Sequence, residues 1–227
     1  MGSKRVLSTI VFLRASRRSR YKVRLGKEGG GSPLISLLSW WFLLAGYFVL
    51  VYFIIVERLL RRTESAKTLK AGSFDRRSTT LVSAGFGLGL VLPLVFAGLG
   101  LFPFQMNLAA GLVGLCVMVL GLVLRVWAAA ALGGYYSRTL LVTKEQKLVT
   151  SGPYARIRHP GYLGSILLWS GFGVLTSNTA ALILFPLMFV GIYLYRISVE
   201  ERMLGEELGG DYAAYRRRTR RLVPFLY

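Results

Sequence analysis

Long runs of apolar residues dominate the chain, and three of them contain no Asp, Glu, Lys or Arg. These uncharged stretches are residues 29–56, 78–124 and 159–195. A helix that crosses a membrane needs about 20 apolar residues. The first stretch therefore predicts one spanning helix and the second predicts two. The third predicts a tight hairpin with short arms, which tilt or local bilayer thinning accommodates. In chain order, the predicted helices are residues 34–56, 81–101, 108–131, 162–175 and 180–195.

These five segments predict an all-α integral membrane protein, and the composition agrees with that fold class. Of the 227 residues, 54% are hydrophobic and only 17% are charged, with a mean hydropathy of +0.52. A soluble domain carries about 25% charged residues, and a disordered basic chain is less apolar than this one. The net charge of +19 nevertheless raises a second possibility, a nucleic-acid-binding domain.

The positions of the basic residues decide between these possibilities. Except for Arg125, they fall in four blocks outside the predicted helices: an N-terminal arm that ends at Lys27, two loops at 58–77 and 138–158, and a tail at 196–221. The positive-inside rule places both loops and the tail in the cytoplasm, where they meet anionic lipid headgroups. The charge thus reports which ends of the helices face the cytoplasm. We expect the protein in the cell membrane or an endoplasmic-reticulum-type membrane. We expect no nucleic-acid partner.

The N-terminal arm does not fit this simple topology. If the first segment crosses the membrane once, the nine basic residues of the arm lie outside. We favour an outside N-terminus over a first segment that fails to cross fully. Cys116 and His159 are the only cysteine and histidine. We therefore expect no metal site of the usual zinc or iron type and no intrachain disulfide.

One candidate site lies where the second basic loop enters the hairpin. Gly152-Pro153 and His159-Pro160-Gly161 are strong turn signals. Two tyrosines, two arginines and the histidine cluster there, at Tyr154, Arg156, Arg158, His159 and Tyr162. Each alone is as well explained by anchoring at the membrane interface. Their combined spacing is more specific than any single residue.

A second candidate site follows the last span. Arg196 and Glu200 are four residues apart, so they share a helix face and can pair, while Glu201 projects about 100° away. A solvated helix start would explain these charges equally well. Ionisable residues at the end of a span are functional candidates when they face a protein cavity. Gly209-Gly210 predicts the end of this helix.

Other function classes lack their signatures. The chain has no Walker A sequence, no Gly-x-Ser-x-Gly and no His-Glu-x-x-His. The predicted spans hold no carboxylates, which a pump or channel would usually show.

Together these motifs resemble the isoprenylcysteine carboxyl methyltransferase family, which belongs with the membrane phospholipid methyltransferases. The similarity covers roughly residues 108–227. It rests on Gly152-Pro153-Tyr154, Arg158-His159-Pro160-Gly161-Tyr162-Leu163-Gly164, Glu200-Glu201, Gly210-x-Tyr212-x-x-Tyr215 and Pro224. The resemblance divides the chain into an arm (1–33), an N-terminal membrane region (34–107) and a methyltransferase core (108–227).

The resemblance implies S-adenosyl-L-methionine as methyl donor and a division of roles among the candidates. Arg196 and Glu200 would act on the acceptor and be catalytic. The implied cofactor-binding residues are Tyr154, Arg158, His159, Pro160, Tyr162, Gly164 and Glu201. Arg158 suits the cofactor carboxylate, and Glu201 suits its amine or ribose hydroxyls. A tyrosine face near the sulfonium adds cation–π attraction.

The acceptor stays open among a prenylcysteine-like carboxylate, a phospholipid amine and a small thiol. A carboxylate needs a cation such as Arg196 to hold it, whereas an amine or thiol needs a base, for which Glu200 is the candidate. The apolar spans would admit a lipophilic or prenylated acceptor from the bilayer while the polar cofactor enters from the cytoplasm. An NADPH-dependent reductase of the sterol-reductase type and a non-enzymatic scaffold are the alternatives of other classes.

Overall fold

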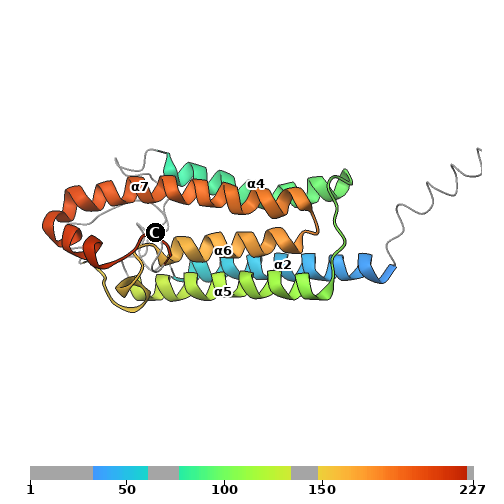
Figure 1. Ribbon diagram of the computed structural model, residues 1–227, viewed down its shortest axis with the longest axis horizontal. Helices are drawn as coiled ribbons and strands as arrows, with labels where there is room; N and C mark the ends of the chain where they lie inside the picture. Colours follow the sequence, from blue (N-terminus) through green and yellow to red (C-terminus); the bar gives the residue numbers. More distant parts are fainter. Residues whose placement is uncertain (1–32, 61–76, 134–147, 224–227) are drawn as a thin grey trace, which may run out of the picture.

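In the part of the chain that the structure describes, five helices run along one common axis (Figure 1). The computed structural model describes residues 33–60, 77–133 and 148–223; residues 1–32 of the N-terminal arm, residues 61–76 and 134–147 around the two basic loops, and Pro224 lie outside them. The helices are α2 (Pro33–Leu60), α4 (Ser78–Gly98), α5 (Leu108–Leu132), α6 (Pro160–Leu175) and α7 (Thr179–Arg218), and a 3-10 turn, η2 (Gly152–Ala155), precedes α6. The predicted all-α architecture is confirmed.

The helices differ in length as the uncharged stretches predict. Among the described residues, α2, α4, α5 and α7 are long and apolar enough to cross a membrane. Helix α6 has 16 residues and is about 24 Å long, less than a hydrocarbon layer about 30 Å thick. Helix α7 runs further than predicted and has 40 residues. Its first part, 179–195, is uncharged, and charged side chains begin at Arg196.

Helix α6 lies at the centre of the bundle. Figure 1 shows α4 and α7 on one side of it and α2 and α5 on the other, and α6 packs against α2, α5 and α7. At one end the connection after α4 meets the hairpin turn. The Phe104 amide donates to the Ser177 carbonyl at 3.0 Å, and the Thr179 amide donates to the Phe102 carbonyl at 2.9 Å. The two uncharged connections thus share one end of the bundle.

Helices α5 and α6 touch backbone to backbone, because glycines face each other across their contact. A methyl group added to Gly121 would lie 2.4 Å from the Leu168 nitrogen, and one added to Gly164 would lie 2.7 Å from the Gly121 carbonyl oxygen. Small residues allow this close packing in lipid, where the hydrophobic effect does not drive helix association. The contact fixes the depth of α6 relative to α5.

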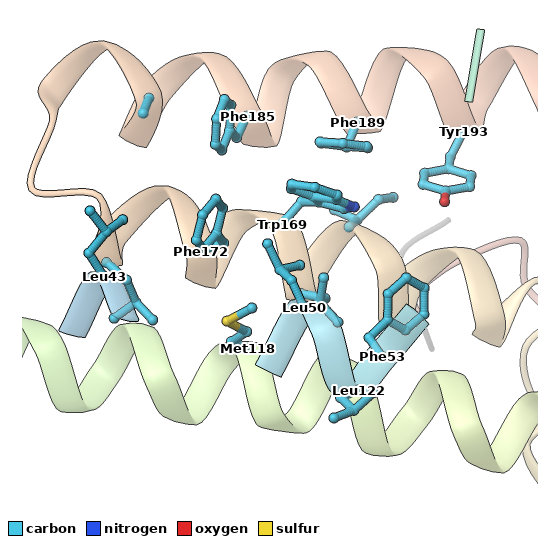
Figure 2. Close-up of a cluster of buried hydrophobic side chains, with 14 of the residues drawn as sticks. Leu43, Leu50, Phe53, Met118, Leu122, Trp169, Phe172, Phe185, Phe189 and Tyr193 are labelled. Atoms are coloured by element: carbon cyan, nitrogen blue, oxygen red, sulfur yellow. The ribbon is translucent and has the colours of Figure 1, made fainter. Parts of the chain in front are cut away.

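Aromatic rings fill the space between α6 and α7. Figure 2 shows Phe185 and Phe189 of α7 directed toward Phe172 and Trp169 of α6. The Trp169 and Phe189 rings stack with centroids 4.7 Å apart. All four side chains are fully buried. Their packing fixes α7 against the hairpin and sets the position of the charged residues that follow.

The charged part of α7 ends in a reversal. Gly209 has φ 52° and ψ −121°, which interrupts the helix and agrees with the predicted Gly209-Gly210 stop. Glycine adopts this left-handed φ without the steric cost that a side chain would add. The chain then returns to the loop before α6, where the Arg158 amide donates to the Arg220 carbonyl at 2.7 Å and the Arg220 amide donates to the Arg156 carbonyl at 3.0 Å.

The Gly121 contact leads to a stability prediction. Gly121→Ala should lower the stability of the bundle by about 1–3 kcal/mol, because the new methyl group meets backbone atoms that cannot move aside. Gly87→Ala is the control, since nothing lies within 4 Å of its added methyl group. Thermal unfolding in detergent measures both. Equal melting temperatures would show that α5 and α6 separate without cost at this point.

Candidate active site

The two sequence-predicted clusters meet at the first turn of α6. The loop before α6, the charged part of α7 and residues 219–221 converge there through the backbone pairs described above. The Tyr215 hydroxyl adds a further link by donating to the Tyr154 carbonyl at 2.7 Å. Residues separated by more than 40 positions in the sequence therefore form one site.

Glu201 is the centre of this site, and three cationic or ionisable side chains surround it. Its Oε1 accepts from Arg158 Nε at 2.8 Å and lies 3.4 Å from His159 Nε2. Its Oε2 accepts from Arg221 Nε at 3.0 Å. The residue is 7% exposed. Burial acts to raise the pKa of Glu201, but hydrogen bonds from His159 and Arg158 outweigh it and lower the pKa to about 2. Glu201 is therefore a carboxylate at physiological pH.

His159 lies between the two glutamates. Its Nδ1 is 3.6 Å from Glu200 Oε2, while its Nε2 faces Glu201. The imidazole ring is buried and stacks on the Tyr162 ring, with centroids 5.5 Å apart and an interplanar angle of 3°. The only histidine is thus a structural link between Glu200 and Glu201 rather than an exposed interfacial side chain.

Tyr162 connects Arg196 to Glu200. Its hydroxyl donates to Glu200 Oε2 at 2.6 Å and accepts from Arg196 Nε at 2.9 Å. Arg196 is 5% exposed, and its guanidinium carbon lies 5.7 Å from the centre of the Tyr162 ring. The spacing of Arg196 and Glu200 on one helix face is confirmed. Tyr162, predicted to contact the cofactor, lies at this pair.

Two further residues at the site were missed by sequence reasoning. Arg196 Nη1 donates to Ser78 Oγ and to Thr79 Oγ1, both at 3.1 Å. Ser78 and Thr79 form the start of α4, about 118 positions before Arg196. The only available signal was that they open an uncharged stretch, which says nothing about such a distant partner.

A second missed contact supports the start of α6 from the opposite side. Arg125 of α5 pairs with Glu57 of α2 at 2.9 Å and donates to the Gly161 carbonyl at 3.1 Å. The sequence placed Glu57 just after the first span, but α2 extends through it to Leu60. Glu57 is buried and Arg125 is half-buried. Each charge offsets the other, and the Gly161 carbonyl accepts from a charged donor.

A groove opens beside Glu201, lined by residues from both sides of the α7 interruption at Gly209. Its volume is about 430 Å³, within the range of small-molecule sites. The lining residues are Glu201, Gly205, Gly209, Tyr212, Ala213, Arg216 and Arg217. The Tyr212 hydroxyl is buried and has no hydrogen-bond partner. A buried hydroxyl without a partner is costly, so this group fits a polar ligand.

The remaining predicted residues take different positions. Pro160 is buried as the first residue of α6. Gly164 faces the backbone of α5, so the structure gives it a helix-packing role. Arg158 directs its guanidinium at Glu201 and at the carbonyls of Arg216 and Thr219. These hydrogen bonds hold the C-terminal segment against the loop before α6.

Comparisons with known proteins point to one family. Residues 112–206 match the model of the isoprenylcysteine carboxyl methyltransferase (ICMT) family. Protein-S-isoprenylcysteine O-methyltransferase B of Arabidopsis thaliana is 30% identical over 155 residues, which are 66% of this chain and 78% of that protein. A probable protein-S-isoprenylcysteine O-methyltransferase of Oryza sativa subsp. indica is 29% identical over 171 residues, 71% of this chain and 90% of that protein.

A solved structure has the same fold. The eukaryotic intramembrane Ras methyltransferase ICMT superposes with a TM-score of 0.54 at 19% sequence identity, covering 97% of this chain and 86% of that one. The fold is therefore that of a multi-pass membrane protein. The match to the methyltransferase family, and not the fold, sets aside the reductase and the scaffold. Enzymes of the matched family use S-adenosyl-L-methionine. The chain belongs to the isoprenylcysteine carboxyl methyltransferase family of S-adenosylmethionine-dependent membrane methyltransferases.

Proposed function

We propose that this protein methylates the carboxylate of a prenylcysteine-like lipophilic acceptor, and that Arg196 binds that carboxylate. The observation that carries this proposal is the position of Arg196. Its guanidinium is buried directly after the uncharged part of α7, where an acceptor that arrives through the bilayer would bring its polar end. The names of the relatives in Arabidopsis thaliana and Oryza sativa support the same acceptor.

The reaction depends on the position of the acceptor carboxylate relative to the methyl donor and needs no proton transfer. When bound, S-adenosylmethionine would supply a methyl group carried on a sulfonium. A carboxylate oxygen held in line with the methyl C–S bond would form the new C–O bond as that C–S bond breaks, giving a methyl ester and releasing S-adenosylhomocysteine. A carboxylate carries no proton to remove, so the task of Arg196 is to hold it in line. Tyr162 and Glu200 hold Arg196 through its Nε.

We assign the cofactor to the groove beside Glu201, because the groups there match its polar parts. The Glu201 carboxylate and the unpartnered Tyr212 hydroxyl suit the amine and the ribose hydroxyls. Arg216 and Arg217 suit the cofactor carboxylate. Arg158 and His159 then serve the cofactor indirectly, by fixing Glu201.

The proposal includes an orientation in the membrane. The groove and the site lie at the end of the bundle opposite the two uncharged connections, and the basic loops and tail join that end. By the positive-inside rule this end faces the cytoplasm. The exposed side chains of Arg218 and Arg220 are then positioned for anionic headgroups.

The purified protein with methyl-labelled S-adenosylmethionine tests the acceptor. We offer it S-farnesylcysteine, a phosphatidylethanolamine vesicle and a small thiol separately. Base-labile label on S-farnesylcysteine, released as methanol, is the expected product. Label on the lipid amine or the thiol, with no methyl ester, would overturn the carboxylate assignment and make Glu200 the candidate base.

Arg196→Ala should lower the rate of transfer on the order of 100-fold or more, because an oriented cation at the reacting group is lost. Binding of S-adenosylhomocysteine, measured by isothermal titration, should stay close to that of the unaltered protein. Arg202→Ala is the matched control, since Arg202 lies in the same part of α7 with its side chain exposed. A loss of S-adenosylhomocysteine affinity in Arg196→Ala would assign Arg196 to the cofactor site instead.

Glu201→Gln should weaken S-adenosylhomocysteine binding by about tenfold or more, because charge-assisted hydrogen bonds are lost at the groove. Glu206→Gln, an exposed carboxylate on the same helix, should bind normally. Melting temperatures of both variants separate a binding effect from unfolding. Normal affinity in a folded Glu201→Gln protein would show that the cofactor binds elsewhere.

A further inference from the structure

The start of α4 contributes two hydroxyl groups to Arg196. Ser78 Oγ and Thr79 Oγ1 each lie 3.1 Å from Arg196 Nη1. Ser78 is completely buried and Thr79 is 7% exposed. The next two hydroxyl residues of the helix, Thr80 and Ser83, are exposed. The hydroxyls that face Arg196 are thus the buried ones.

These hydroxyls have a role other than capping α4. Serine and threonine near a helix start usually accept from its free amides. Here the N-cap residue is Arg77, in a left-handed conformation, and its side chain makes no capping hydrogen bond. Ser78 and Thr79 follow it within the first turn, and their hydroxyl oxygens accept from the guanidinium.

The kind of partner distinguishes Arg196 from two half-buried arginines of the site, Arg125 and Arg158. Arg125 pairs directly with Glu57, and Arg158 pairs directly with Glu201, so each faces a negative charge. Ser78 and Thr79 are neutral. A neutral acceptor satisfies an N–H group and fixes its direction without cancelling the charge. Ser78 and Thr79 therefore fix the direction of the Arg196 guanidinium without adding a negative charge beside it.

We infer that Ser78 and Thr79 are positioning residues that hold the Arg196 guanidinium ready for the acceptor carboxylate. This inference rests on the proposed function and extends it to the N-terminal half of the chain, outside the residues 112–206 that match the family model. It makes α4 part of the acceptor site. The effect of α4 on the reaction passes through Arg196, so it concerns acceptor binding and leaves the cofactor groove unchanged.

The test uses the full chain with S-farnesylcysteine as acceptor. In the double variant Ser78→Ala/Thr79→Val, the KM for S-farnesylcysteine should rise about tenfold, the scale expected when hydrogen bonds to a charged group are lost. The kcat should fall less, and S-adenosylhomocysteine should bind as before. The variant Ser78→Thr/Thr79→Ser keeps both hydroxyls and should restore a low KM. Ser83→Ala/Thr80→Val, which removes the exposed neighbours, should behave as the unaltered protein.

Each contrary result has a distinct meaning. An unchanged KM in the folded Ser78→Ala/Thr79→Val variant overturns this inference and leaves the proposed function intact. A parallel loss of S-adenosylhomocysteine affinity, or no rescue by Ser78→Thr/Thr79→Ser, overturns it by showing a general packing role. Failure of the unaltered protein to esterify S-farnesylcysteine overturns the proposed acceptor, and this inference with it.

Discussion

Charged side chains at the end of apolar helices keep their charge only when other polar groups surround them, and the whole site depends on this condition. Glu201 is an ion because Arg158, Arg221 and His159 surround it. Arg196 is buried because Tyr162 and two hydroxyls receive its N–H groups. The contacts that stabilise these charges are also the contacts that join α4, α6, α7 and the C-terminal segment.

The site separates two tasks that a membrane methyltransferase must combine. The groove beside Glu201 lies on the charged part of α7, suited to a polar cofactor. Arg196 lies one helix turn earlier, where the uncharged part ends. His159 and Tyr162 stack between them and bond to the two adjacent glutamates. One helix therefore carries both halves of the site, and the first turn of α6 connects them.

Sequence reasoning recovered the features that depend on local pattern. Uncharged stretches located the helices, the Gly209-Gly210 pair located the reversal, and helical periodicity placed Arg196 and Glu200 on one face. It did not find the pairing of Glu57 with Arg125 or that of Ser78 with Arg196, because these partners lie 68 and 118 positions apart. No periodicity links such residues; only the packed bundle does. Gly164 is a further example. Its place in the Arg158–Gly164 motif suggested a cofactor contact, and the sequence does not reveal that the backbone of α5 packs against it.

The short length of α6 has a geometric consequence. The contacts of Gly164 with Gly121 and of Gly161 with Arg125 set the first turn of α6 level with Arg125, while α5 continues to Leu132. Seven further residues at 1.5 Å each raise the end of α5 about 10 Å above that level. The first turn of α6, which carries Tyr162, is thus recessed relative to the end of α5. In the proposed function, this depth lets a lipid-borne acceptor present its carboxylate to Arg196 while its chain stays in the hydrocarbon layer.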